Sequence, residues 1–272
     1  MTIKSFYLGN LLNHKARKRF GQNFLHDHNV IYNILSNIHA NEGEHWVEIG
    51  PGLGAITEPL LQEKITLDVV ELDRDLVKFL IDKFKDKENF SIHSADALNF
   101  DFAALAKQDE KLRIIGNLPY NISTPLLFHL LDSAYCIEDM HFMLQKEVVD
   151  RICAEPGSKK YGRLSVMIQY YCETELVFDV PPESFDPIPK VMSAIINLTP
   201  HKTPPVEIES IEKLNKVVTT AFSQRRKTIR NSLKKLITEE QIITLNIDPT
   251  LRAESISLSE FASLSQIIQS QD

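Results

Sequence analysis

The sequence predicts an α/β protein with a mostly parallel, doubly wound sheet and a small all-helical domain at its C-terminal end. Short apolar runs of strand length alternate with stretches whose apolar residues recur at helical spacing. A glycine-rich loop follows one of these runs and precedes a helical stretch, an arrangement typical of parallel α/β sheets that bind ligands at the carboxyl ends of their strands.

The elements can be placed in order along the chain. Apolar residues at 31, 34, 35 and 38 predict a helix over 30–40. Strands are predicted at 45–49, 65–72, 91–96, 112–117, 139–145, 175–180 and 193–200, and helices near 55–63, 76–80, 124–131, 147–154 and 163–171. Two prolines within 201–207 indicate a linker, which divides the chain into domains 1–200 and 201–272. Helical periodicity resumes from Ile211 to Phe222.

Composition excludes some classes of protein and limits others. The chain has 272 residues, 43% of them hydrophobic and 25% charged, which is ordinary for a globular protein. No apolar run approaches the roughly 20 residues that span a bilayer, and the first 20 residues do not resemble a secretory signal. Three cysteines without a CxxC spacing favour reduced thiols. We therefore expect a cytoplasmic protein.

Two basic stretches interrupt an acidic chain whose formal net charge is −7. Neither contains an acidic residue, and both are candidate RNA-binding surfaces because a local positive charge attracts phosphate. Solvated basic faces are the alternative. The first stretch includes Lys15, Arg17, Lys18 and Arg19, and the second includes Arg225, Arg226, Lys227 and Arg230.

The residues at the ends of three predicted strands indicate a ligand pocket. Gly50, Gly52 and Gly54 let a ligand approach the backbone, although a GxGxG spacing alone is equally typical of a tight turn. Glu71 ends the next strand, where a carboxylate accepts both ribose hydroxyls, and Asp96 can accept from the adenine amino group. A helix cap is the alternative for Asp96. An adenosine without phosphate fits this pattern, which favours S-adenosylmethionine over a dinucleotide.

The stretch GNLPYNIS at 116–123 follows a fourth strand. Its Asn, Pro and Ser could simply form a turn. Alternatively, the side-chain oxygen of Asn117 and the backbone carbonyl of Leu118 accept hydrogen bonds from an adenine amino group, which directs the nitrogen lone pair toward a methyl donor. Tyr120 then stacks on the base, which must leave the RNA stack to be modified.

Seven ordered motifs give a resemblance that covers nearly the whole chain. They read KARKRFGQNFL, VEIGPGLGAIT, VVELDRDL, ADAL, GNLPYNISTPLL, PPESFDPIPKVMSA and FSQRRKTIRNSL. The chain is thereby similar to the ribosomal RNA adenine dimethylases of the KsgA (RsmA) family. The resemblance implies a Rossmann-like methyltransferase domain with a seven-stranded sheet and a small helical C-terminal domain. It also implies dimethylation of N6 on two adjacent adenosines in the 3′-terminal hairpin of 16S rRNA, in the assembling 30S subunit.

The resemblance also implies roles for individual residues. It places Asn23, Leu25, Gly50, Glu71, Asp96 and Asn117 at the cofactor, and Asn117, Leu118, Tyr120 and Phe185 at the target base. Phe185 is the second stacking aromatic in this assignment, and a core phenylalanine is its alternative.

Other functions remain open from the sequence. A related dimethylase of large-subunit rRNA, an assembly factor whose binding matters more than its methylation, and a nicotinamide dehydrogenase are the competitors. His26 and His28 lie two apart, but nothing completes a metal site, so we expect surface polar residues and no metal. Nothing indicates a paired surface, and we expect a monomer.

Overall fold

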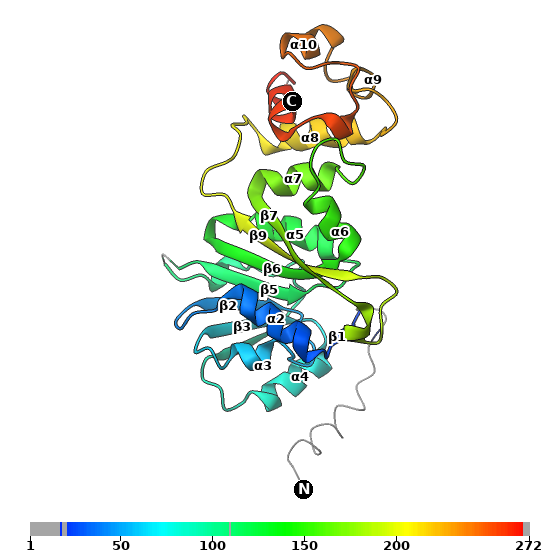
Figure 1. Cartoon of the computed structure of the whole chain (residues 1–272). Coiled ribbons are helices and arrows are strands. Elements are labelled where there is room, and N and C mark those ends of the chain that lie inside the picture. The colour runs from blue at the N-terminus through cyan, green and yellow to red at the C-terminus, as the bar shows by residue number, and fades with distance from the viewer. Residues whose placement is uncertain (1–16, 18–20, 109, 269–272) are drawn as a thin grey trace. The chain divides into compact units, whose positions relative to one another are not determined.

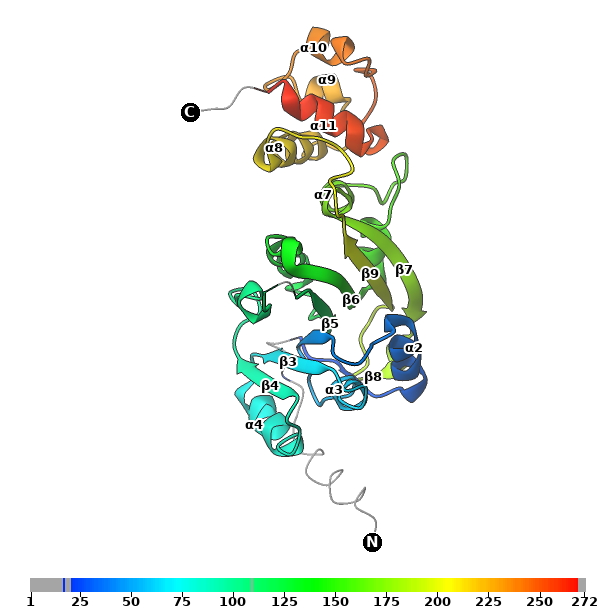
Figure 2. The same cartoon turned by 90° about the vertical axis from the view of Figure 1, so that its left-hand side faces the viewer.

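The computed structural model describes residue 17 and residues 21–108 and 110–268. Seven strands form one sheet, and helices lie on both sides of it (Figures 1 and 2). The strands are β2 (His45–Ile49), β3 (Thr66–Glu71), β4 (Phe90–Ser94), β5 (Leu112–Asn117), β6 (Ile137–Gln145), β7 (Cys172–Val180) and β9 (Ser193–Pro200). The sequence predicted all seven strands and the α/β class.

Helices alternate with these strands in the first half of the chain and dominate the second. They are α2 (His28–Ile38), α3 (Thr57–Leu60), α4 (Arg74–Lys83), α5 (Ser123–Leu131), α6 (Lys146–Ile152), α7 (Arg163–Tyr171), α8 (Ile211–Phe222), α9 (Ile229–Ser232), α10 (Glu239–Thr244) and α11 (Leu258–Gln266). Among the helices that the structure describes, none is long and apolar enough to cross a bilayer.

The order of the strands fixes where a ligand can bind. The sheet runs β4, β3, β2, β5, β6, β9, β7, and the four pairings from β4 to β6 are parallel. The chain moves outward in one direction from β2 to β4 and in the other direction from β5 to β6. The connections therefore diverge between β2 and β5, so a crevice forms beyond the carboxyl ends of these two strands.

A second, two-stranded sheet joins segments that are far apart in the sequence. β1 (Phe24–Leu25) pairs antiparallel with β8 (Phe185–Asp186), with Phe24 opposite Asp186 and Leu25 opposite Phe185. The sequence analysis did not predict either strand. The pairing attaches the GQNFL segment to the segment that precedes β9.

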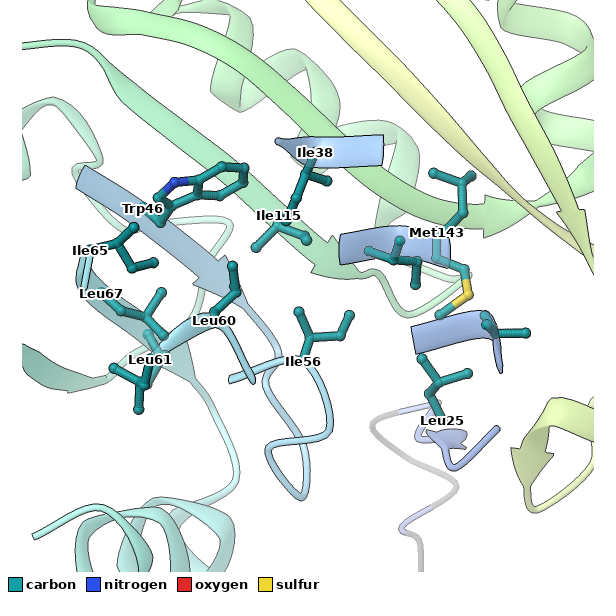
Figure 3. Packing of buried hydrophobic residues seen from close by; sticks show 14 of the residues in the cluster. Leu25, Ile38, Trp46, Ile56, Leu60, Leu61, Ile65, Leu67, Ile115 and Met143 are labelled. Carbon is teal, nitrogen blue, oxygen red and sulfur yellow. The ribbon is translucent and has the colours of Figure 1, made fainter. Parts of the chain in front are cut away.

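One apolar cluster holds the sheet and the helices on one of its faces together. Residues of α2, α3 and α4 share it with the inward side chains of β2, β3 and β5. Figure 3 shows Ile38, Leu60 and Trp46 among these side chains. Each of these three residues is at most 1% exposed. Since burial of such side chains supplies about 25 cal/mol per Å² of apolar area, this cluster is a main source of stability for the ligand-binding edge.

Contacts divide the chain into two compact units. The first comprises Met1–Gln145 and Val177–Ile195, and the second comprises Lys146–Leu176 and Ile196–Asp272. In the second unit α8 packs against α7 and α11. The domain boundary predicted at residue 200 instead groups α6 and α7 with the first domain. That boundary stays a prediction.

Candidate active site

A cavity of about 200 Å³ lies at the carboxyl ends of β2, β3, β4 and β5. Every predicted cofactor residue borders it, as do Leu118 and Tyr120. The wall is built from the strap 21–25, the loop 50–56 and the residues that follow the ends of β3, β4 and β5. The structure therefore brings together the ends of four strands and one N-terminal segment. The sequence analysis had connected them only through motifs along the chain.

The glycine loop has backbone geometry that other residues adopt with strain. Gly50 has φ of +68° and Gly52 has φ of +58°. A Cβ at Gly52 would lie 3.1 Å from Cδ1 of Phe24, so the strap and the loop approach closely because a side chain is missing. The Gly50 N–H donates to the Val70 carbonyl at 3.0 Å, which ties the loop to the end of β3.

The two predicted acidic residues lie on this wall and are partly engaged by their own backbone. Glu71 is 7% exposed, and one of its oxygens accepts from the Asp73 N–H at 2.7 Å. Burial raises the pKa of Glu71 above its ordinary value. Asp96 accepts from the Leu98 N–H at 3.0 Å in a turn, but no helix begins there, so the helix-cap alternative is wrong for Asp96, which borders the cavity.

Asn117 is oriented by the strap. Its Nδ2 donates to the backbone carbonyl of Asn23 at 2.9 Å. This contact orients the amide, and its side-chain oxygen is the group that can accept a hydrogen bond from a ligand. Tyr120 is half-buried, and its hydroxyl shares a hydrogen bond of 2.8 Å with the hydroxyl of Ser193. That bond restrains the aromatic ring next to the amide.

Arg17, which precedes the strap, and Gln22, which lies in it, are both anchored to Asp73 at the start of α4. The Arg17 guanidinium contacts the carboxylates of Asp73, at 2.8 Å, and of Asp75. Gln22 accepts from the Arg17 N–H at 2.8 Å and donates to Asp73 at 3.2 Å. Two carboxylates thus neutralise Arg17, which disfavours its predicted role in binding phosphate. Lys15, Lys18 and Arg19 lie outside the described residues.

Phe185 is placed away from the cavity. Its side chain is 1% exposed, belongs to the apolar cluster and does not border the cavity. The geometry matches the core alternative, because a base can stack on this ring only if the ring leaves its packing. Its role as a stacking aromatic stays a prediction.

Leu72 is a site residue that the sequence analysis missed. It borders the cavity while its side chain is 49% exposed, although most leucines are buried. An exposed apolar side chain next to the Glu71 carboxylate can pack against the face of a planar ring. The signal in the sequence was its position directly after Glu71 at the end of a strand.

Glu48, which was not among the predicted cofactor residues, is a buried acid on the cavity wall. It is 2% exposed and accepts from the Thr57 hydroxyl at 2.5 Å. Burial raises the pKa of Glu48 from 4.5 to about 7, and the nearby Glu71 carboxylate acts in the same direction. A cationic ligand in the cavity would favour the ionised form, because opposite charges attract.

We expect Glu48→Gln to remove part of the pH dependence of folding. The folded carboxyl binds its proton more tightly than the unfolded one, so its stabilising contribution is complete below pH 4.5 and is lost as pH rises to about 7. The contribution amounts to about 3 kcal/mol. Urea unfolding of the wild type and the variant between pH 4.5 and 8 measures it. Equal slopes in the two proteins would contradict the assignment to Glu48.

The basic stretch of the second unit covers the turn between α8 and α9, where Arg225, Arg226 and Lys227 lie, and continues into α9 with Arg230. Arg225 donates to the carbonyls of Lys159 and Tyr161, at 2.8 and 3.2 Å, and Arg230 pairs with Glu239 at 3.1 Å. Arg226 and Lys227 are exposed and form no ion pair with any described residue. Two of the four predicted cations are thus available for phosphate without breaking an internal contact.

Metal ligands are not grouped in the part of the chain that the structure describes. Within it, no three His, Cys, Asp or Glu residues are arranged to hold a metal ion. His26 and His28 are both exposed.

Comparison with known proteins agrees with this geometry. The family model described as ribosomal RNA adenine dimethylase matches residues 13–270. The chain belongs to the ribosomal RNA adenine dimethylase family. It is accordingly an rRNA adenine dimethyltransferase that uses S-adenosylmethionine, as the sequence motifs predicted.

Individual relatives of this dimethylase span nearly its whole length. It is 56% identical over 257 residues to the ribosomal RNA small subunit methyltransferase A of Pseudomonas aeruginosa, covering 94% of this chain and 96% of the relative. The protein of the same name from Acinetobacter baylyi is 54% identical over 252 residues, covering 93% and 92%.

Solved structures show the same fold at low identity. The 23S rRNA methyltransferase ErmE is similar with a TM-score of 0.70 and 24% identity, over 89% of this chain and 98% of that one. A dimethyladenosine transferase from Plasmodium falciparum has a TM-score of 0.73 and 22% identity, over 89% and 95%. These likenesses confirm the predicted Rossmann-like methyltransferase fold.

Proposed function

We propose that this dimethylase transfers two methyl groups to N6 of each of two adjacent adenosines in the 3′-terminal hairpin loop of 16S rRNA, during assembly of the 30S subunit. The observation that carries the proposal is the wall of the cavity. It places the free oxygen of Asn117 and the ring of Tyr120 beside the glycine loop and Glu71. A target base and a cofactor can therefore meet at one point.

The cofactor end of the cavity has the groups that an adenosine requires. Glu71 can accept from the ribose hydroxyls with the oxygen that Asp73 does not occupy. Leu72 offers an apolar face for the adenine ring, and Asp96 can accept from its amino group. Asn23, Leu25 and Gly50 complete the wall around the remainder of the molecule.

The chemistry of the target end depends on its acceptors. When bound, S-adenosylmethionine supplies an electrophilic methyl group. The Asn117 oxygen and the Leu118 carbonyl accept from the two hydrogens of the adenine amino group, which makes the nitrogen more pyramidal and directs its lone pair. Tyr120 stacks on the extruded base. The proton released after transfer leaves to solvent, so no side chain has to act as a strong base.

The choice of the small subunit rests on sequence similarity. Relatives named for the small subunit are 52–56% identical to this chain, whereas the 23S rRNA enzyme is 24% identical. We place the reaction in the cytoplasm, where bacterial subunits assemble, and propose that the enzyme acts as a monomer.

Transfer of labelled methyl groups to 30S particles that lack this modification tests the proposal. Label on N6 of two neighbouring adenosines in the 3′-terminal hairpin is the expected result. Label confined to large-subunit RNA would move the enzyme to the other branch of the family. An absence of label in both RNAs, with S-adenosylmethionine still bound, would overturn the proposed target while leaving the cofactor site intact.

RNA binding by the α8–α9 turn predicts a change in salt dependence. Each phosphate contact adds roughly one unit to the slope of log affinity against log salt. The double variant Arg226→Ala, Lys227→Ala is therefore expected to reduce the slope by about two units in binding to 30S particles. Lys85 and Lys87 are exposed lysines after α4, and their double alanine variant is the charge-matched control. An equal reduction of the slope in both double variants would mean that the slope depends on the net charge of the protein and not on phosphate contacts of Arg226 and Lys227.

A further inference from the structure

An exposed apolar loop lies between β8 and β9. Ile188 is 66% exposed, Val191 44% and Met192 38%. Three large apolar side chains within five residues are unusual on a surface, and grouped apolar residues of this kind mark interaction sites. Lys190 in the same loop is exposed and has no ion pair with a described residue.

Both ends of this loop are fixed to the wall of the cavity. On one side, Phe185 and Asp186 pair with the strap residues Leu25 and Phe24, which border the cavity. On the other side, Ser193 is fully buried and its hydroxyl is bonded to that of Tyr120 at 2.8 Å. The loop is thus continuous with the rim of the cavity where the target base enters, so its partner reaches the protein together with that base.

The chemistry of the loop fits single-stranded RNA. Extruding a base leaves a gap in the stack, and apolar side chains such as Ile and Met can occupy a gap between base steps. A lysine among them can pair with a flanking phosphate. A protein partner would also fit the apolar residues and could offer a carboxylate to Lys190, but the loop continues into the wall of the cavity that receives an RNA base, which favours RNA.

We propose that the loop 187–192 is an RNA wedge, in which Ile188 and Met192 fill the space left by the extruded adenosine and Lys190 binds an adjacent phosphate. The inference rests on the proposed function, because it requires an RNA base in the cavity. It adds a surface for the nucleotides next to the target adenosine.

The double variant Ile188→Ser, Met192→Ser tests the wedge. Both side chains are exposed, so folding is expected to be unaffected and calorimetry should give an unchanged affinity for S-adenosylmethionine. We expect kcat/KM for 30S particles to fall on the order of tenfold, since two apolar side chains lose their burial against RNA. Ile81→Ser is the matched control, because Ile81 is 51% exposed on α4. Variant activity equal to the wild type would overturn the proposal.

Cross-linking identifies the partner directly. A photoreactive benzophenone amino acid at position 188 of the full chain is expected to cross-link to rRNA near the methylated adenosines. Cross-links to a ribosomal protein alone would overturn the wedge and assign the loop to protein docking. If the wild type does not methylate the particles at all, the proposed function itself fails, which is a different outcome from equal activity of wild type and variant.

Discussion

Asn117→Ala is expected to lower the rate of methyl transfer about a hundredfold, by analogy with the loss of one preorganised hydrogen-bond partner in other active sites. The variant removes the side-chain oxygen proposed to orient the adenine amino group. Single-turnover transfer to unmethylated 30S particles measures this step without product release. Asn121→Ala is the control, because Asn121 borders the same cavity and its side chain has no proposed role.

Asn117→Asp separates the two contacts of this side chain. It keeps an oxygen for the amino group but replaces the nitrogen that donates to Asn23 by a second acceptor. If the acceptor is what matters, the aspartate variant retains more of the transfer rate than the alanine variant. If Asn117 acts only by holding the strap, both variants lose affinity for S-adenosylmethionine and neither changes the rate at saturating cofactor.

Local patterns in the sequence were sufficient to predict the sheet but not every helix boundary. β2, β5 and β9 have the predicted bounds because their apolar runs are flanked by turn residues. The helix predicted over 55–63 is only Thr57–Leu60. Gly54, with φ of +80°, delays its start, and Lys64, with φ of +56°, lies in a left-handed turn beyond its end. At Gly54 the loop packs closely against Phe84, a long-range contact that apolar periodicity does not report.

Long-range contacts account for most of what was missed at the site. The pairing of β1 with β8 joins residues 24–25 to 185–186, and strands of two residues carry no period of their own. The same pairing buries Phe185. Arg17 was assigned to RNA on the charge of its neighbours in sequence, whereas its contacts are carboxylates more than fifty residues away. A run of basic residues therefore predicts local positive charge. Which of those residues are paired with carboxylates of the same protein depends on the fold.

The sequence also did not predict which elements pack against each helix. The sequence predicts a helix over 163–171, and Leu164, Met167 and Ile168, which share one face at helical spacing, are at most 4% exposed. Helical periodicity shows that a face is buried but not against what. Contacts place α7 with α6, α8 and α11, all within the second unit.

Arg113→Ala is expected to cost about 3–5 kcal/mol of the free energy of unfolding. The guanidinium is 12% exposed and donates to Asp139 at 2.7 and 2.9 Å, to Glu44 at 2.8 Å and to the Ile38 carbonyl at 2.7 Å. It also lies 4.2 Å from the centre of the Trp46 ring. The network joins β2, β5 and β6 at the edge opposite the cavity, and its removal leaves two carboxylates without their main partner. Urea unfolding of the wild type and the variant measures the loss.

Lys64→Ala distinguishes this local network from a general effect of charge. Both substitutions remove one positive charge from a chain of net charge −7, so any long-range electrostatic effect is similar in the two variants. Lys64 and its partner Glu42 are 73% and 70% exposed, and loss of such a pair costs at most about 1 kcal/mol. Arg113→Lys should fall between the two alanine variants, because an ammonium keeps the charge but cannot reach both carboxylates and the carbonyl in one plane. Equal losses for Arg113→Ala and Lys64→Ala would mean that the fork geometry of Arg113 adds nothing to the stability of the sheet.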